Sequence, residues 1–106
     1  MGNYGCISWQ KRYLNAMYYV YVLLSSKDNK LYTGSTRDLR NRLVRHNKGL
    51  VKATKARKPL KLVYYEAGLS RKDAMRREIY LKTAWGKKYV KSRLKDYFSM
   101  SQLDKP

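Results

Sequence analysis

The chain has 106 residues and a formal net charge of +18 at pH 7, from 25 lysines and arginines against 7 aspartates and glutamates. This length allows one domain with one modest core, and the single cysteine excludes internal disulfides and cysteine-based metal clusters. So large an excess of one charge favours a polyanionic partner, because surfaces built only for solubility mix both signs.

A membrane is the other anionic surface to weigh against nucleic acid. No stretch of the sequence approaches the roughly 20 apolar residues of a spanning helix, and no segment pairs a polybasic face with a broad apolar one. We therefore expect nucleic acid as the partner and no membrane contact. The lone Cys6 and the lack of an uninterrupted apolar signal in the first residues favour a cytoplasmic location.

Two interpretations of residues 1–16 stay open. This segment mixes Gly, Asn, Ser and Trp with little periodicity, and a clear strand begins after it. Met17 is then either the biological start, with residues 1–16 as an extension, or the continuation of an ordered arm anchored by Trp9 and Tyr13. In both cases we expect the core domain at residues 17–98 and a C-terminal tail at residues 99–106.

A β-hairpin is predicted at the start of the core domain. Residues 18–24 are aromatic and β-branched and are apolar on both faces, which predicts a strand in the centre of a sheet. The turn signal Asp28-Asn29 leads to a second short strand at residues 31–34. Because the link is short, the two strands are expected to pair in antiparallel fashion.

A helix and a third strand are predicted next. Thr36 is the expected N-cap of the helix, which runs to about Lys48 and ends at Gly49. Residues 49–60 follow as a basic loop, and residues 62–65 are rich in strand-forming side chains.

The last third of the chain is predicted to be helical. Ser70-Arg71-Lys72-Asp73 has the form of a capping box and opens a second helix, which we expect Gly86 to break before a third helix begins. The expected apolar positions of these helices are Met75, Ile79 and Leu81 and then Val90, Leu94 and Tyr97. The predicted fold is α+β, a small three-stranded antiparallel sheet flanked by helices in the order β-β-α-β-α-α.

Two tripeptides in the predicted hairpin carry a family resemblance. Tyr19-Val20-Tyr21 lies in the first strand and Tyr32-Thr33-Gly34 in the second, with Tyr21 and Tyr32 eleven positions apart. Further along the helical part of the chain come Arg42, His46 and Glu78. Over roughly residues 17–97 this ordered set resembles the GIY-YIG family of metal-dependent endonucleases, above all its small stand-alone members, often labelled after the incision subunit of nucleotide excision repair.

The resemblance implies an endonuclease that hydrolyses phosphodiester bonds in DNA, with a place in repair or recombination, and it does not exclude RNA. It implies Glu78 as the sole protein ligand of one Mg²⁺ or Mn²⁺ ion, because a magnesium ion that keeps several waters needs few carboxylates. We expect no small-molecule cofactor. By residue type alone, we would expect Glu78 to form a helix-surface salt bridge with Lys82. Val90 lies about where some relatives carry an Asn near this Glu.

Arg42 and His46 are four apart and so project from one helix face. Arg42 suits the stabilisation of charge on a phosphate during catalysis, or plain phosphate binding. His46 suits a proton relay, a phosphate contact or a hydrogen-bonded position at the boundary of the core.

Tyr21 and Tyr32 are expected to face each other across the hairpin, and the resemblance implies that one of them takes a proton from the attacking water. Their alternative role is core packing. Gly34 is expected to let the backbone turn close to the site. Core packing is also the role that we assign to three other strand tyrosines, Tyr18, Tyr64 and Tyr65.

Basic side chains cluster in residues 37–61, and a second basic run lies in residues 87–95. Phosphate contacts from such a cluster give affinity and position rather than sequence choice. The side chains expected to make them are Arg37, Arg40, Arg45, Lys48, Lys52, Lys55, Arg57, Lys58 and Lys61.

Two rivals of the nuclease hypothesis fit the same composition. One is a non-catalytic nucleic-acid-binding module on the same fold, and the other is an RNA-associated or ribosome-bound structural protein. The ribosome-bound protein has no reason to gather Tyr21, Tyr32, Arg42 and Glu78 around one cleft. The spatial arrangement of these four side chains therefore discriminates between the hypotheses.

Overall fold

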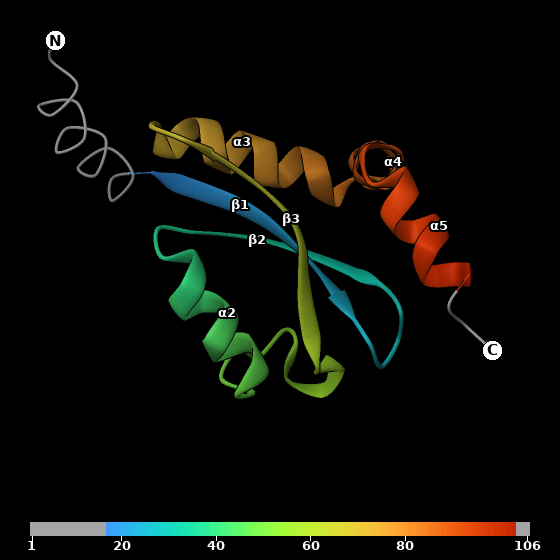
Figure 1. Ribbon diagram of the computed structural model, residues 1–106. Coiled ribbons are helices and arrows are strands. Elements are labelled where there is room, and N and C mark those ends of the chain that lie inside the picture. Colours follow the sequence, from blue (N-terminus) through green and yellow to red (C-terminus); the bar gives the residue numbers. More distant parts are fainter. Residues whose placement is uncertain (1–16, 104–106) are drawn as a thin grey trace, which may run out of the picture.

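Three antiparallel strands form the central sheet of the computed structural model, which describes residues 17–103 (Figure 1). They are β1 (Tyr18–Ser25), β2 (Leu31–Thr36) and β3 (Leu60–Gly68), and their order across the sheet is β2-β1-β3. The prediction of a central first strand and an antiparallel hairpin is confirmed, as is the α+β class with a three-stranded sheet. The proposed extension at residues 1–16 lies outside the described residues.

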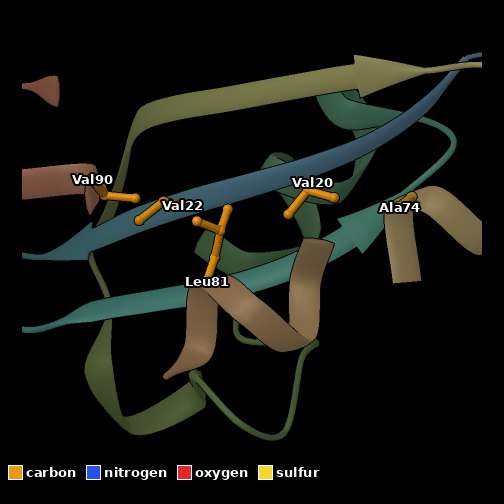
Figure 2. Close-up of a cluster of buried hydrophobic side chains, with 5 residues drawn as sticks. All are labelled: Val20, Val22, Ala74, Leu81 and Val90. Atoms are coloured by element: carbon orange, nitrogen blue, oxygen red, sulfur yellow. The ribbon is translucent and has the colours of Figure 1, made fainter. Parts of the chain in front are cut away.

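Helices cover both faces of this sheet. Helix α2 (Leu39–Asn47) packs on one face, and α3 (Arg71–Lys82) and α4 (Ala84–Arg93) pack on the other (Figure 1). The alternating side chains of β1 therefore enter two separate clusters. Val20 and Val22 pack against α3 and α4, as Figure 2 shows.

The second cluster lies on the α2 side of the sheet. Its fully buried members are Tyr21, Leu23 and Leu60, with Leu39 and Leu43 of α2 packed against them. Because β1 buries side chains on both faces, its sequence is apolar at consecutive positions and shows no alternation.

The start of α2 differs from the expectation. Asp38 is the N-cap, and its carboxylate accepts a hydrogen bond from the backbone N–H of Asn41 at 3.1 Å. Thr36 cannot cap the helix because it still pairs with Tyr19 in the sheet. At the other end Gly49 has a φ of +76°, which confirms the predicted stop.

Strand β3 is longer than its strand-forming core at residues 62–65. It pairs with β1 along nearly the whole length of that strand, with one irregularity opposite Val22 and Leu23. This pairing brings in Lys61, Glu66 and Ala67, which have low intrinsic strand propensity. Tyr65 is 53% exposed and packs on Tyr19 with ring centroids 5.8 Å apart, so its assignment to the core is wrong.

Helix α3 begins at the predicted cap, where the Ser70 hydroxyl accepts from the backbone N–H of Asp73 at 3.3 Å. Its expected apolar side is wrong at two positions, because Met75 and Ile79 are 49% and 66% exposed. The helix instead buries Ala74 and Leu81, which are seven residues apart and so share a face (Figure 2).

Gly86 does not break the second helix as expected, since it lies inside α4. The break is at Thr83, whose hydroxyl accepts from the backbone N–H of Gly86 at 3.1 Å. A Cβ on Gly86 would lie 2.1 Å from the carbonyl oxygen of Tyr80, so the glycine allows α3 and α4 to meet at a tight corner. The single third helix expected after it is two helices, since α4 ends at Arg93 with Leu94 as its C-cap and α5 (Lys95–Leu103) follows.

Helix α5 continues through the first residues of the segment expected to be a C-terminal tail. Among the helices of residues 17–103, none has the length and apolarity needed to cross a lipid bilayer.

Candidate active site

Tyr21 stands at the centre of the candidate site. It lies in the middle of β1 with its side chain almost fully buried, and it pairs with Gly34 of β2. A Cβ on Gly34 would lie 2.5 Å from the Tyr21 hydroxyl oxygen and 2.7 Å from the ring carbon that bears it. Gly34 thus makes room for the phenol within a strand, and the turn expected at this position is absent from the structure of β2.

His46 holds the Tyr21 hydroxyl from the α2 side. The distance from this hydroxyl to Nε2 of His46 is 2.7 Å, and Nδ1 of His46 lies 2.7 Å from the hydroxyl oxygen of Thr54. Both His46 and Thr54 are fully buried. The basic loop after α2 therefore folds back, and Thr54 supplies the second partner of the imidazole just before a short 3₁₀ helix, η1 (Lys55–Arg57).

The environment of His46 keeps its ring neutral at pH 7. Burial, together with the nearby positive charge of Arg42, lowers the pKa of His46 to about 4. Because the ring has no exposed surface, it cannot touch a phosphate directly in this arrangement. Its two ring nitrogens instead contact the hydroxyl groups of Tyr21 and Thr54.

Arg42 contacts the same phenol from one helical turn earlier. Its Nε donates a hydrogen bond to the Tyr21 hydroxyl at 3.3 Å. That hydrogen bond raises the pKa of Arg42, while burial opposes the rise. Burial raises the pKa of Tyr21, and the hydrogen bond and charge of Arg42 oppose that rise. The predicted shared face of Arg42 and His46 is therefore the face that meets Tyr21.

Tyr32 lies on the same face of the sheet as Tyr21 but not opposite it, because its partner across the hairpin is Leu23. The rings of Tyr21 and Tyr32 pack edge-on against His46, with centroid distances of 5.5 Å and 5.3 Å. Tyr32 is half-buried. The expected face-to-face pair is thus a diagonal pair with the imidazole between the two phenols.

Glu78 approaches the site from α3, on the other face of the sheet. Its Oε1 accepts a hydrogen bond from the Ser35 hydroxyl at 2.7 Å, and its Oε2 lies 3.0 Å from Nζ of Lys82. The salt bridge with Lys82 considered from the sequence is therefore present, and the carboxylate also faces β2. Its negative charge contributes to raising the pKa of Tyr21 and of Arg42, so these groups share one electrostatic environment.

Strand β2 joins the two halves of the site. Gly34 and Ser35 are consecutive residues of this edge strand, and consecutive strand residues point to opposite faces. Tyr21 lies over Gly34, and Glu78 bonds to Ser35. The phenol and the carboxylate therefore contact consecutive residues of the same edge strand, from opposite faces of the sheet.

An open groove of about 600 Å³ begins at Glu78. It is lined by Tyr18, Ser35, Thr36, Arg37, Arg71, Ala74, Met75 and Glu78. In residues 17–103 no three His, Cys, Asp or Glu side chains form a group that could hold a metal ion. One half-buried carboxylate beside an open groove still fits a hard divalent cation, because such a cation takes its other oxygens from water and phosphate.

The basic residues predicted to bind phosphate divide into two groups. The exposed ones are Arg37, Arg40, Arg45, Lys48, Lys52, Lys55, Lys58 and Lys61. Arg57 is already engaged, since its Nε lies 2.6 Å from Oδ2 of Asp28, and this ion pair lowers the pKa of Asp28 to about 2. Lys61 lies over the ring of Tyr97 in α5, with Nζ 5.3 Å from the ring centroid.

Sequence reasoning missed Ser35, Thr54 and Arg71. Ser35 was visible only as the neighbour of the Tyr32-Thr33-Gly34 tripeptide. Thr54 carries no signal of its own, because it is a small polar residue in a loop of lysines. Arg71 appeared only as part of the capping box, and its place on the same helix face as Glu78 follows from the seven-residue spacing on α3.

The fold agrees with the comparison with known families. The family model described as the GIY-YIG catalytic domain matches residues 17–91. The chain belongs to the GIY-YIG family.

Its relatives include several UPF0213 proteins. One from Pediococcus pentosaceus is 41% identical over 87 residues, which are 81% of this chain and 90% of that relative. One from Staphylococcus haemolyticus is 48% identical over 69 residues, 64% of this chain and 83% of the relative. One from Streptococcus agalactiae is 51% identical over 65 residues, 60% of this chain and 73% of the relative. No solved structure matches the chain significantly.

Proposed function

We propose that this protein is a divalent-metal-dependent endonuclease that hydrolyses phosphodiester bonds in DNA, in repair or recombination. The observation that carries the proposal is the Tyr21 hydroxyl, held by His46 and Arg42 against Gly34, with Glu78 hydrogen-bonded to the next residue of β2, Ser35. A buried phenol with a base on one side and a cation on the other is more than core packing requires. Membership of the GIY-YIG family supports the same activity.

The hydrogen bonds define a path for the proton of the attacking water. The Thr54 hydroxyl is 3.5 Å from the carbonyl oxygen of Val51, so it can donate there and accept from Nδ1–H of His46. Nε2 of His46 is then the acceptor for the Tyr21 O–H. Because Tyr21 is almost fully buried, a movement of the side chains around it first admits the water to its hydroxyl. When this water loses a proton to the Tyr21 oxygen, the phenol passes its own proton to His46, and the hydroxide oxygen attacks phosphorus.

Arg42 assists both events. Its guanidinium stabilises negative charge on the Tyr21 oxygen and on the phosphate as the bond to the leaving oxygen breaks. A Mg²⁺ or Mn²⁺ ion held by Glu78 would supply Lewis-acid polarisation of the scissile phosphate and of the leaving oxygen. Ser35 orients the carboxylate through its hydrogen bond to Oε1.

One observation favours a second candidate, a non-catalytic nucleic-acid-binding module. Lys82 occupies Oε2 of Glu78, as it would in a purely structural ion pair. The charge of +18 suits such a module equally well. It predicts tight, salt-sensitive binding to DNA with no cleavage in any divalent metal.

Nicking of supercoiled plasmid DNA separates the two candidates. The wild-type protein should convert the plasmid to the open circle with Mg²⁺ or Mn²⁺ and not with EDTA. Glu78→Gln should lose at least about 100-fold in rate while it binds DNA as before. Asp96→Asn, which changes an exposed acid on α5 to its amide, is the matched control. Equal nicking by the Glu78 variant would refute the proposed site, and binding without nicking by the wild type would favour the binding module.

A further inference from the structure

The groove beside Glu78 contains features that the proposed chemistry does not use. One wall is the end of β2 and the residue after it, Arg37, and the other is the first half of α3. The groove residues of α3 are Arg71, Ala74, Met75 and Glu78, whose spacing places them on one face of the helix. Arg71, Ala74 and Met75 thus line the groove on the N-terminal side of Glu78, the candidate metal ligand.

Two arginines from different elements border this groove. Arg37 lies with its guanidinium 4.9 Å from the centroid of the Tyr18 ring, where stacking limits its motion while leaving its N–H groups able to donate. Arg71 is exposed and is the first residue of α3. Met75, 49% exposed, lies one helical turn after Arg71 and supplies an apolar surface between the cations and Glu78.

We propose that this groove is a second phosphate subsite, in which Arg37 and Arg71 bind a phosphodiester of the cut strand within about three nucleotides of the one that is hydrolysed. A sugar of the intervening backbone lies against Met75. The subsite rests on the proposed function only for its position relative to the cut, because its affinity for a nucleic-acid backbone follows from the groove itself.

The distance between Arg71 and Glu78 along α3 determines which phosphate the subsite binds. Arg71 precedes Glu78 by seven residues, or about 10 Å along the helix axis at 1.5 Å per residue. Successive charges on one strand of duplex DNA are about 3.4 Å apart along its axis. The subsite therefore holds a phosphate within about three nucleotides of the scissile one, and it fixes the register of the strand against Glu78.

Binding measurements test the subsite without any need for cleavage. The probe is a fluorescein-labelled 12-nucleotide DNA, titrated by anisotropy with the full-length protein in EDTA over a series of salt concentrations. Arg71→Ala and Arg37→Ala should each weaken binding several-fold and reduce the slope of log Kd against log salt by about 0.7 to 0.9. Lys72→Ala removes the same charge from an exposed neighbour that does not line the groove, and should change the slope by less than half as much.

Neutralising single phosphates of the probe locates the contact. When a neutral methylphosphonate replaces the phosphate that Arg71 binds, Arg71→Ala should cause no further loss of DNA affinity, because the charged partner of Arg71 is already absent. Equal effects of Arg71→Ala and Lys72→Ala, or additive losses at every methylphosphonate position, would overturn the subsite. A wild-type protein that binds in this way but cuts no DNA would instead overturn the proposed nuclease and leave the subsite standing.

Discussion

The Tyr21 hydroxyl lies 2.7 Å from Nε2 of His46. Within residues 17–103, this contact and the hydrogen bond from Arg42 to the same oxygen are the only two hydrogen bonds between side chains of β1 and α2. Tyr21 is thus both a core residue and the centre of the proposed catalytic site. A change that moves the phenol should affect stability and activity together.

Gly34→Ala should displace the phenol. The new Cβ would lie 2.5 Å from the Tyr21 hydroxyl oxygen, so either the ring or β2 must move. We expect a loss of about 1–3 kcal/mol in the free energy of unfolding, measured by urea denaturation, and near-complete loss of nicking. Gly68→Ala is the matched control, because a Cβ there meets nothing within 4 Å. If both variants behaved alike, the close approach at Gly34 would have no energetic significance.

The stability of the protein should depend on the protonation of His46. Its pKa is about 4 in the folded protein and near 6.5 when unfolded, so the unfolded chain binds the extra proton between these values. The contribution of His46 is therefore complete above pH 6.5 and decreases as the pH falls towards 4, by up to about 3 kcal/mol. Urea denaturation at pH 7 and pH 5 measures this decrease.

His46→Gln supplies the comparison for the pH experiment. The variant keeps a polar side chain but has no group that titrates in this range, so its stability should change less between pH 7 and pH 5. Asp28 does not disturb the comparison, because its pKa of about 2 places its own effect below this window. The same pH slope in both proteins would show that His46 is not the group responsible.

Thr54→Val should impair the site from a distance. Valine has nearly the shape of threonine but leaves Nδ1 of the buried His46 without its partner, at a cost of about 1–3 kcal/mol in stability. It also frees His46 to adopt the other tautomer, so single-turnover cleavage should slow and its pH profile should shift. Thr54→Ser keeps the hydroxyl and should restore both. Failure of serine to restore them would point to packing rather than the hydrogen bond.

Ser35→Ala should weaken metal binding through Glu78. The hydroxyl donates to Oε1 at 2.7 Å, and loss of such a supporting contact reduces metal affinity by about 10-fold or more. Electron paramagnetic resonance of free Mn²⁺, titrated with protein, measures the affinity directly. Ser92→Ala, at an exposed position of α4, is the control. Unchanged Mn²⁺ affinity in Ser35→Ala would mean that the hydrogen bond does not orient the ligand.

The strands could be predicted because their signals are local. The apolar run around Val20 and Val22 requires burial on both faces, and the turn at Asp28-Asn29 fixes the hairpin. Helix α3 shows the opposite case. Met75 and Ile79 look like core positions in sequence, but the buried face is chosen by contact with β1 and α4, which Ala74 and Leu81 make.

The candidate site could be predicted only in part, for a related reason. Charged and aromatic residues such as Arg42 and Glu78 attract attention by their chemistry. Ser35 and Thr54 are ordinary residue types whose importance comes from what lies within 3 Å of them, and that distance is a property of the folded chain. The roles of all these residues stay predictions until the variants are measured.

Tyr21 and Glu78 are held by different hydrophobic clusters, which meet only through the three strands. Warming that loosens one cluster would separate the phenol from the carboxylate while the other cluster stays intact. Nicking activity should therefore be lost at a lower temperature than the circular dichroism signal. The proposed site requires both clusters to stay packed, whereas the secondary structure requires the unfolding of the whole domain to disappear.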